Sequence, residues 1–136
     1  RQKVNVVREE IELQVITPNE PGIFGRVLAT LANAGINLRA YCVQSEKYQE
    51  KSQFNLVTSD YKKAEAALRS LGFKIKTTKV ITVEVDDRIG VGAEIGALLA
   101  GAVVDIRYSY GSSAGAGRSL LVFKTSNNSK ALKTLQ

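Results

Sequence analysis

The sequence of 136 residues contains no histidine, no methionine, no tryptophan and a single cysteine, Cys42. The lack of histidine excludes imidazole general bases, Ser-His-Asp triads and histidine-ligated metals. With one cysteine, neither a thiolate zinc cluster nor an internal disulfide can form. These absences argue against most classes of enzyme, and we expect no catalytic residue, no cofactor and no metal site.

The charged residues are spread along the chain rather than clustered. The formal net charge is +6, yet the densest basic group is the pair Lys62 and Lys63. This distribution is typical of a solvated surface and predicts no nucleic-acid partner. No apolar run approaches the roughly 18 residues of a membrane-spanning helix, so we expect no membrane partner. An unpaired cysteine and no visible signal peptide favour a cytoplasmic protein.

The sequence is similar to itself after a shift of 68 positions, and internal repeats decide the whole fold where they occur. Val15 aligns with Val83, and Gly22 with Gly90. After one deletion near residue 50 the shift becomes 67. The other first-copy residues that have an identical partner include Ala29, Leu31, Ala32, Ala34, Arg39, Ser45, Thr58, Ser59, Lys63, Ala64 and Leu68. We interpret the chain as two copies of about 68 residues each.

Hydrophobic periodicity predicts the same order of elements in each copy. The elements of the first copy are a strand at 11–15, a helix at 23–34, strands at 36–42 and 54–56, a helix at 64–71 and a strand from 73. This βαββαβ order is the split βαβ motif of ferredoxin-like folds. In the strand at 36–42, alternation places Cys42 on the apolar face. In the second copy, the same alternation places Tyr108 and Tyr110 on one strand face with the apolar Val104 and Ile106.

The predicted fold class is α+β, with two tandem ferredoxin-like modules that have antiparallel sheets and helices on one face. We expect an N-terminal extension at 1–9, a first module at 10–78 and a second module at 79–136 that lacks its own last strand. The extension contains an apolar stretch at 4–7. That stretch, or a strand from a partner, is expected to fill the vacant edge, because an open edge invites pairing.

The turn that opens the first helix carries the most informative chemistry. Unpaired N–H groups at a helix N-terminus attract a carboxylate or phosphate. Gly22 lets a ligand approach the backbone, and Asn19 supplies amide donors and an acceptor. With Asn37 and the N–H groups of Ile23 and Phe24, this turn would hold a small zwitterion. The alternative is structural, with Asn19 as a helix N-cap and Asn37 as a solvated residue.

Two stretches of the first copy resemble the ACT domain family. They are the turn at 19–27, N-E-P-G-I-F-G-R-V, and the helix end at 31–38, L-A-N-A-G-I-N-L. Family members share an N/D-x-P-G-hydrophobic turn, an amphipathic helix and an A/G-G-I-N-hydrophobic start to the second strand. From about residue 10 onward the chain resembles small bacterial proteins made of two ACT modules in tandem.

The resemblance implies a regulatory protein, a homodimer, that binds an amino acid at the seam between modules. In family members that bind serine, polar residues matching Asn19 and Asn37 contact the ligand. The other matching positions are Gly22, Ile23, Phe24 and Leu38 in the first copy, and Asp87, Gly90, Val91, Asp105 and Ile106 in the second. The second copy departs from the pattern, since aspartates replace both asparagines and repel a ligand carboxylate. We therefore expect the first site to bind better.

Three alternatives remain open on the sequence alone. Tandem ACT modules also occur attached to catalytic domains of amino-acid biosynthesis, and the absence of methionine fits a fragment of such an enzyme. The second alternative is a nucleic-acid-binding ferredoxin-like domain, and the third is a dimerisation module without ligand.

The glycine-rich segment at 111–117 is predicted as a hairpin, because it joins two strands and lacks the lysine of a phosphate loop. Arg39 and Arg107 share a repeat position, where they form outward ion pairs or grip a ligand carboxylate.

Overall fold

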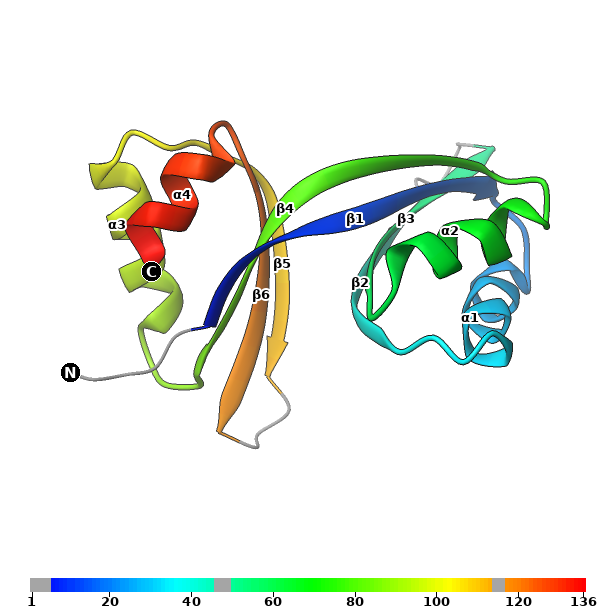
Figure 1. The fold of residues 1–136 in the computed structure, drawn as a ribbon, viewed down its shortest axis with the longest axis horizontal. Helices are drawn as coiled ribbons and strands as arrows, with labels where there is room; N and C mark the ends of the chain where they lie inside the picture. Colours follow the sequence, from blue (N-terminus) through cyan, green and yellow to red (C-terminus); the bar gives the residue numbers. More distant parts are fainter. Residues whose placement is uncertain (1–5, 46–49, 114–116) are drawn as a thin grey trace. The chain divides into compact units, whose positions relative to one another are not determined.

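The computed structural model describes residues 6–45, 50–113 and 117–136, and these form six strands and four helices. In chain order the elements are β1 (Val6–Pro18), α1 (Ile23–Asn33), β2 (Leu38–Gln44), β3 (Lys51–Thr58), α2 (Tyr61–Arg69), β4 (Lys74–Asp86), α3 (Val91–Gly101), β5 (Ile106–Ser113), β6 (Arg118–Thr125) and α4 (Asn128–Leu135) (Figure 1). The expected polar turn after β2, the tip of the glycine-rich hairpin and part of the N-terminal stretch lie outside the described residues.

The chain forms two compact units that both draw on the long strands β1 and β4. The first module is Ile11–Thr78, and the second combines the N-terminal residues up to Glu10 with Lys79–Gln136. The strand order β2-β3-β1-β4-β6-β5 gives the first module the sheet β2-β3-β1-β4 and the second the sheet β1-β4-β6-β5. Strand β3 pairs antiparallel with β1 and β2, as β6 does with β4 and β5. The predicted fold of two ferredoxin-like modules is confirmed.

Residues 6–10 of β1 occupy the fourth-strand position in the sheet of the second module. They lie beside β4, which follows β1 in the strand order. Val7 packs against the core of the second module, and the hydroxyl of Thr82 donates a hydrogen bond to the Glu10 carboxylate. In this structure β4 of the second module is therefore covered by the N-terminal segment, which leaves it no open edge.

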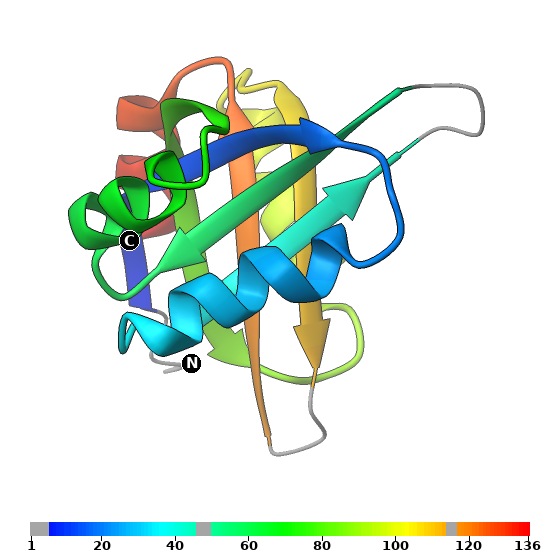
Figure 2. The same ribbon diagram turned by 90° about the vertical axis from the view of Figure 1, so that its right-hand side faces the viewer.

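Each module has its own hydrophobic core between its two helices and one face of its sheet. In the first module, α1 buries one face formed by Ile23, Val27 and Leu31. Figure 2 shows this helix crossing in front of β2 and β3. In the second module, the same positions on α3 bury Ile95 and Leu99. The apolar stripe read from the sequence is therefore the surface that fixes each helix on its sheet.

Backbone details recur at equivalent positions of the two modules. The N-cap residues of α1 and α3, Gly22 and Gly90, have φ angles of 88° and 89°. This left-handed conformation favours glycine, which has no Cβ. Helices α2 and α4 are capped by Asp60 and Asn127, whose side chains each accept a hydrogen bond of 3.1 Å from the N–H three residues on. These matched features support the duplication read from the sequence.

Strand β2 contains a β-bulge, and the predicted face of Cys42 in this strand is therefore wrong. The register of β2 shifts just after Leu38, so that Tyr41 pairs with the core residue Leu56, and Cys42 pairs with Asn55. Cys42 is thus a half-buried free thiol on the face away from the core, not on the apolar face. A bulge adds one residue, and with a side-chain period of two that residue reverses every face that follows.

The same shift occurs in β5, directly after Ile106. Beyond it, Ser109 is the residue opposite the core residue Phe123. Tyr108 and Tyr110 therefore face away from the core, contrary to the alternation that grouped them with the apolar residues before the bulge.

The two modules differ at the residue that follows the first helix. Gly35 has a φ of 74°, and the equivalent Val103 has a φ of 58°, the only positive value of a non-glycine residue in the described part of the chain. A left-handed conformation costs a β-branched residue about 1–2 kcal/mol. The side chain of Val103 is 84% exposed, so it recovers little of this cost by burial.

We expect Val103→Gly to raise the free energy of unfolding by about 1 kcal/mol, because relief of strain exceeds the flexibility that glycine adds to the unfolded chain. Chemical denaturation measures this difference. The reciprocal change, Gly35→Val, is the matched control and should lower stability by about 1–2 kcal/mol. A Val103→Gly variant no more stable than the parent would contradict the assignment of strain.

Candidate functional site

The turn between β1 and α1 is organised by backbone contacts rather than by a side-chain cap. Gly22 is the N-cap residue of α1 and makes no side-chain cap hydrogen bond, so Asn19 does not serve as the cap. Instead, the Asn19 carboxamide oxygen accepts a hydrogen bond from the Ser52 hydroxyl at 3.3 Å. Its backbone N–H donates to the Glu50 carbonyl at 2.8 Å. Asn19 is thereby held at the start of β3, with its side chain exposed.

The first turn of α1 leaves fewer N–H groups available than the sequence suggested. The N–H of Ile23 donates to the Glu20 carbonyl at 3.2 Å, and Ile23 itself is buried. The N–H groups of Phe24 and Gly25 find no acceptor in the described part of the chain. Of the two predicted backbone donors, the one on Phe24 is therefore open to a ligand.

An exposed aromatic pair lies beside this turn. The Phe24 ring is 43% exposed and stands edge-on to Tyr41 of β2, with ring centroids 5.8 Å apart. Below it, Phe24 stacks on the buried Phe54 at 6.3 Å. Tyr41 is 48% exposed and lies on a strand at the edge of the sheet. This edge therefore presents apolar surface on a strand whose neighbour among the described strands is β3.

Asn37 lies at the opposite end of β3 from Asn19. Its backbone N–H donates to the Ser59 hydroxyl at 3.1 Å, and its carbonyl accepts from the Ser59 N–H at 2.9 Å. The anchors Ser52 and Ser59 are seven residues apart on extended chain, a span of about 23 Å. One module therefore does not bring Asn19 and Asn37 onto a single compact ligand. Leu38, which follows, is half-buried and packs against the core.

The second module repeats this arrangement with aspartates. The N–H of Asp87 donates to the Gly117 carbonyl at 2.9 Å, and the N–H of Asp105 donates to the Ser126 hydroxyl at 3.0 Å. These anchors lie at opposite ends of β6, so Asp87 and Asp105 are also far apart within one module. Ile106, which follows Asp105, is 41% exposed at the start of the edge strand β5.

An ion pair between Arg88 and Glu94 lies at the start of α3 in the second module. After the N-cap Gly90, the N–H of Val91 donates to the Arg88 carbonyl at 3.3 Å. The Arg88 guanidinium binds both carboxylate oxygens of Glu94, at 2.5 and 2.6 Å. The hydrogen bond with Glu94 raises the pKa of Arg88 above its ordinary value. The first module carries the two charges in reverse order at these positions, Glu20 and Arg26, and these two residues form no ion pair with each other in the structure.

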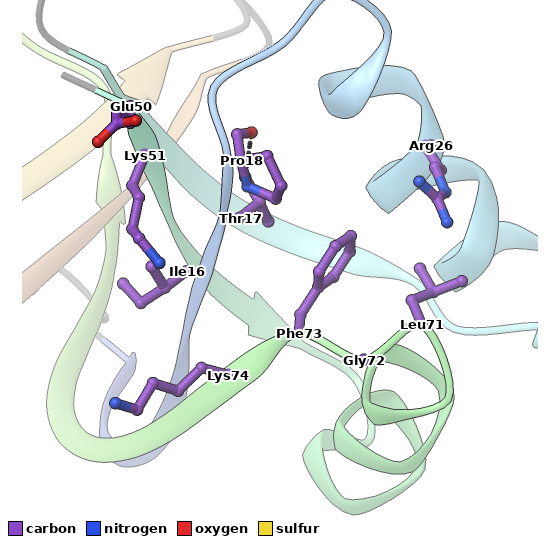
Figure 3. Close-up of a pocket in the computed structure, with 10 residues that line it drawn as sticks. All are labelled: Ile16, Thr17, Pro18, Arg26, Glu50, Lys51, Leu71, Gly72, Phe73 and Lys74. Atoms are coloured by element: carbon purple, nitrogen blue, oxygen red, sulfur yellow. Dashed lines mark hydrogen bonds between the residues drawn. The ribbon is translucent and has the colours of Figure 1, made fainter.

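A cavity of about 520 Å³ opens beside the β1–α1 turn of the first module (Figure 3). It lies where the end of β1 and the start of β3 meet the turn between α2 and β4. The lining residues are Ile16, Thr17, Pro18, Arg26, Glu50, Lys51, Leu71, Gly72, Phe73 and Lys74. None of them was predicted as a site residue. The cavity brings together segments that are far apart in the sequence.

The residues that the structure describes lack two further features. They contain no group of three or more cysteine, aspartate or glutamate side chains arranged to hold a metal ion. None of their helices is both long enough and apolar enough to cross a membrane.

Comparison with solved structures finds the same arrangement of elements elsewhere. A protein of Bacteroides thetaiotaomicron, BT0572, is 25% identical with a TM-score of 0.85, over 95% of this chain and 88% of that one. The ligand-free regulatory subunit of aspartate kinase from Thermus thermophilus is 16% identical with a TM-score of 0.75, over 98% and 95%. The regulatory subunit from Thermus flavus is 18% identical with a TM-score of 0.66, over 96% and 94%.

Comparison of the sequence with curated proteins finds no match. A family model described as an ACT domain pair matches residues 10–135, which is nearly the whole chain. This match agrees with the turn and helix-end motifs of the first copy and with the two βαββαβ modules of the structure. The chain belongs to the ACT domain pair family.

Proposed function

We propose that this chain is a non-catalytic regulatory protein of the cytoplasm. It would bind a small amino acid at a seam formed when two modules join edge to edge in a homodimer. The observation that carries the proposal is the placement of Asn19 and Asn37 at opposite ends of β3, the strand next to the edge strand β2. Membership of the ACT domain pair family and the resemblance to serine-binding members support it.

The strand register explains why two modules are needed. In β2, Leu38 lies opposite Thr58 and Gln44 lies opposite Gln53, so the end of β2 is at the same end of the sheet as Asn19. If two β2 strands pair antiparallel about a two-fold axis, the start of one meets the end of the other. Asn37 of one copy then approaches Asn19 of its partner.

The edge has the properties that such pairing requires. Strand β2 is last in the strand order of the described residues, so no described strand pairs with its outer N–H and C=O groups. Beside it, Phe24 and Tyr41 expose aromatic surface that pairing would cover. The open N–H of Phe24 would receive the ligand carboxylate, and the asparagine carbonyls would accept from its ammonium group. In the second module, carboxylates at these positions disfavour the same ligand.

The proposal predicts that one amino acid in a panel raises the melting temperature. A ligand at 100 times its Kd adds about 2.7 kcal/mol of stability. We expect Asn37→Ala and Asn19→Ala each to abolish the shift, because each removes a polar contact to the ligand. The exposed Asn33 on α1 provides the matched control, and Asn33→Ala should retain the shift.

Light scattering on the same samples tests the seam. The ligand-responsive species should be a dimer. Three results would each count against the proposal. The first is that Asn33→Ala also loses the thermal shift, and the second is that Asn19→Ala and Asn37→Ala both keep it. The third is a monomer that binds the ligand equally well.

A further inference from the structure

We propose that the cavity of the first module is a second binding site, for a small organic dianion such as a dicarboxylate or a phosphate monoester. It adjoins Asn19, whose N–H donates to the Glu50 carbonyl, but its lining contains none of the residues proposed for the seam and lies wholly within Ile11–Thr78. Its lining carries three cationic side chains, those of Arg26, Lys51 and Lys74, against one carboxylate, that of Glu50.

The aromatic ring of Phe73 lies among the cationic side chains of the cavity and contacts one of them. In Figure 3 the ring stands between Arg26 on one side and Lys51 and Lys74 on the other. The Arg26 guanidinium carbon lies 5.8 Å from the ring centroid, a cation–π contact that holds the guanidinium in place. An arginine positioned in this way can bind a carboxylate or phosphate through two parallel hydrogen bonds.

The cationic groups of this lining are not neutralised by the protein around them. Arg26, Lys51 and Lys74 form no ion pair with any residue that the structure describes. All three side chains are exposed, so they are reachable from solvent. A positively charged concave surface raises the local concentration of small anions.

The second module shows that this excess charge is not a requirement of the fold. Glu94 stands at the position of Arg26, and Asp86 stands at that of Pro18. Arg118, the counterpart of Lys51, pairs with Asp86 at 2.9 Å, and Glu94 pairs with Arg88. Arg118, at the position of Lys51, is therefore paired in the second module, whereas Lys51 and Arg26 form no ion pair with any described residue of the first.

The apolar part of the lining suits the carbon skeleton of a metabolite. Ile16, Pro18, Leu71 and Phe73 form apolar walls, and Gly72, with a φ of 84°, turns the chain between two of them. A volume of about 520 Å³ lies within the usual range of small-molecule sites. Apolar walls with a few charged groups are the usual composition of such sites.

Titration calorimetry with succinate and with glycerol 3-phosphate, at constant ionic strength, tests the proposal. We expect saturable binding of at least one probe, and the preferred probe identifies a carboxylate or a phosphate ligand. Arg26→Gln should weaken binding about tenfold, because a charge-assisted contact is lost. Lys51→Gln should weaken it in the same direction. Glu50→Gln should strengthen it about threefold, since it removes a like charge from the lining.

Two controls separate this site from other effects. Lys62→Gln removes the same charge from an exposed position on α2 and should leave the affinity unchanged. Asn37→Ala, which lies at the other end of β3, should keep dianion binding even where it abolishes the amino-acid response, so the two proposals fail independently. Absence of saturable binding of both probes, or equal weakening by Lys62→Gln and Arg26→Gln, would overturn the proposal.

Discussion

Deleting residues 1–10 is expected to lower the free energy of unfolding by at least about 3 kcal/mol. The deletion removes residues 6–10 of β1 from the sheet of the second module and exposes β4 there. It also removes the burial of Val7 against the second core. Hydrogen exchange should show the loss of protection in the second-module part of β4 and in β6. Strands β2 and β3 should remain protected.

A synthetic peptide of residues 1–10 provides the complementary test. Added to the shortened protein, it should bind by strand addition and restore protection in β4. A peptide of the same composition in scrambled order should not. If the shortened protein kept its stability and its pattern of exchange, residues 6–10 would not be a structural part of the second module, and another strand would have to cover β4.

Replacing Phe54 by alanine is expected to destabilise the first module by about 3–5 kcal/mol. Phe54 is fully buried at the centre of the first core, and its removal leaves a cavity below the helix start. It also supports the exposed ring of Phe24, which stacks on it at 6.3 Å. We therefore expect the variant to lose the proposed amino-acid response together with stability. Denaturant titration and the thermal-shift panel measure the two effects.

The equivalent residue of the second module is the control for this prediction. Leu121 is only half-buried, so Leu121→Ala should cost about 1–2 kcal/mol and leave the first module intact. Equal losses in the two variants would show that the stabilities of the modules do not depend on these local cores.

Much of the fold could be predicted because the same hydrophobic pattern occurs in both copies, so each copy supports the elements predicted for the other. Apolar spacing at 3.6 and 2 residues gave the element types, and the repeated pattern fixed their order. The alternation failed where β2 and β5 contain a bulge, because one extra residue does not alter composition. Consequently Cys42 lies on the opposite face from the one predicted, as do Tyr108 and Tyr110.

The geometry of the candidate site was harder to predict, because spacing along the chain does not give distance in space. Asn19 and Asn37 are separated by a helix that carries the chain from one end of the sheet to the other. The cavity was missed because its lining joins the end of β1 and the start of β3 to residues 71–74, which lie far from them in the sequence. The exchange of Arg26 for Glu94 between the copies was a signal that could have drawn attention to it.

The continuity of β1 has a consequence for how this protein can be divided. Its two halves belong to different modules, as do the two halves of β4. A fragment cut out to match the second repeat alone would therefore lack one strand of its own sheet. A gene fusion designed to swap one repeat between relatives should carry the first ten codons with the C-terminal repeat. Evolution by simple shuffling of single repeats would meet the same obstacle.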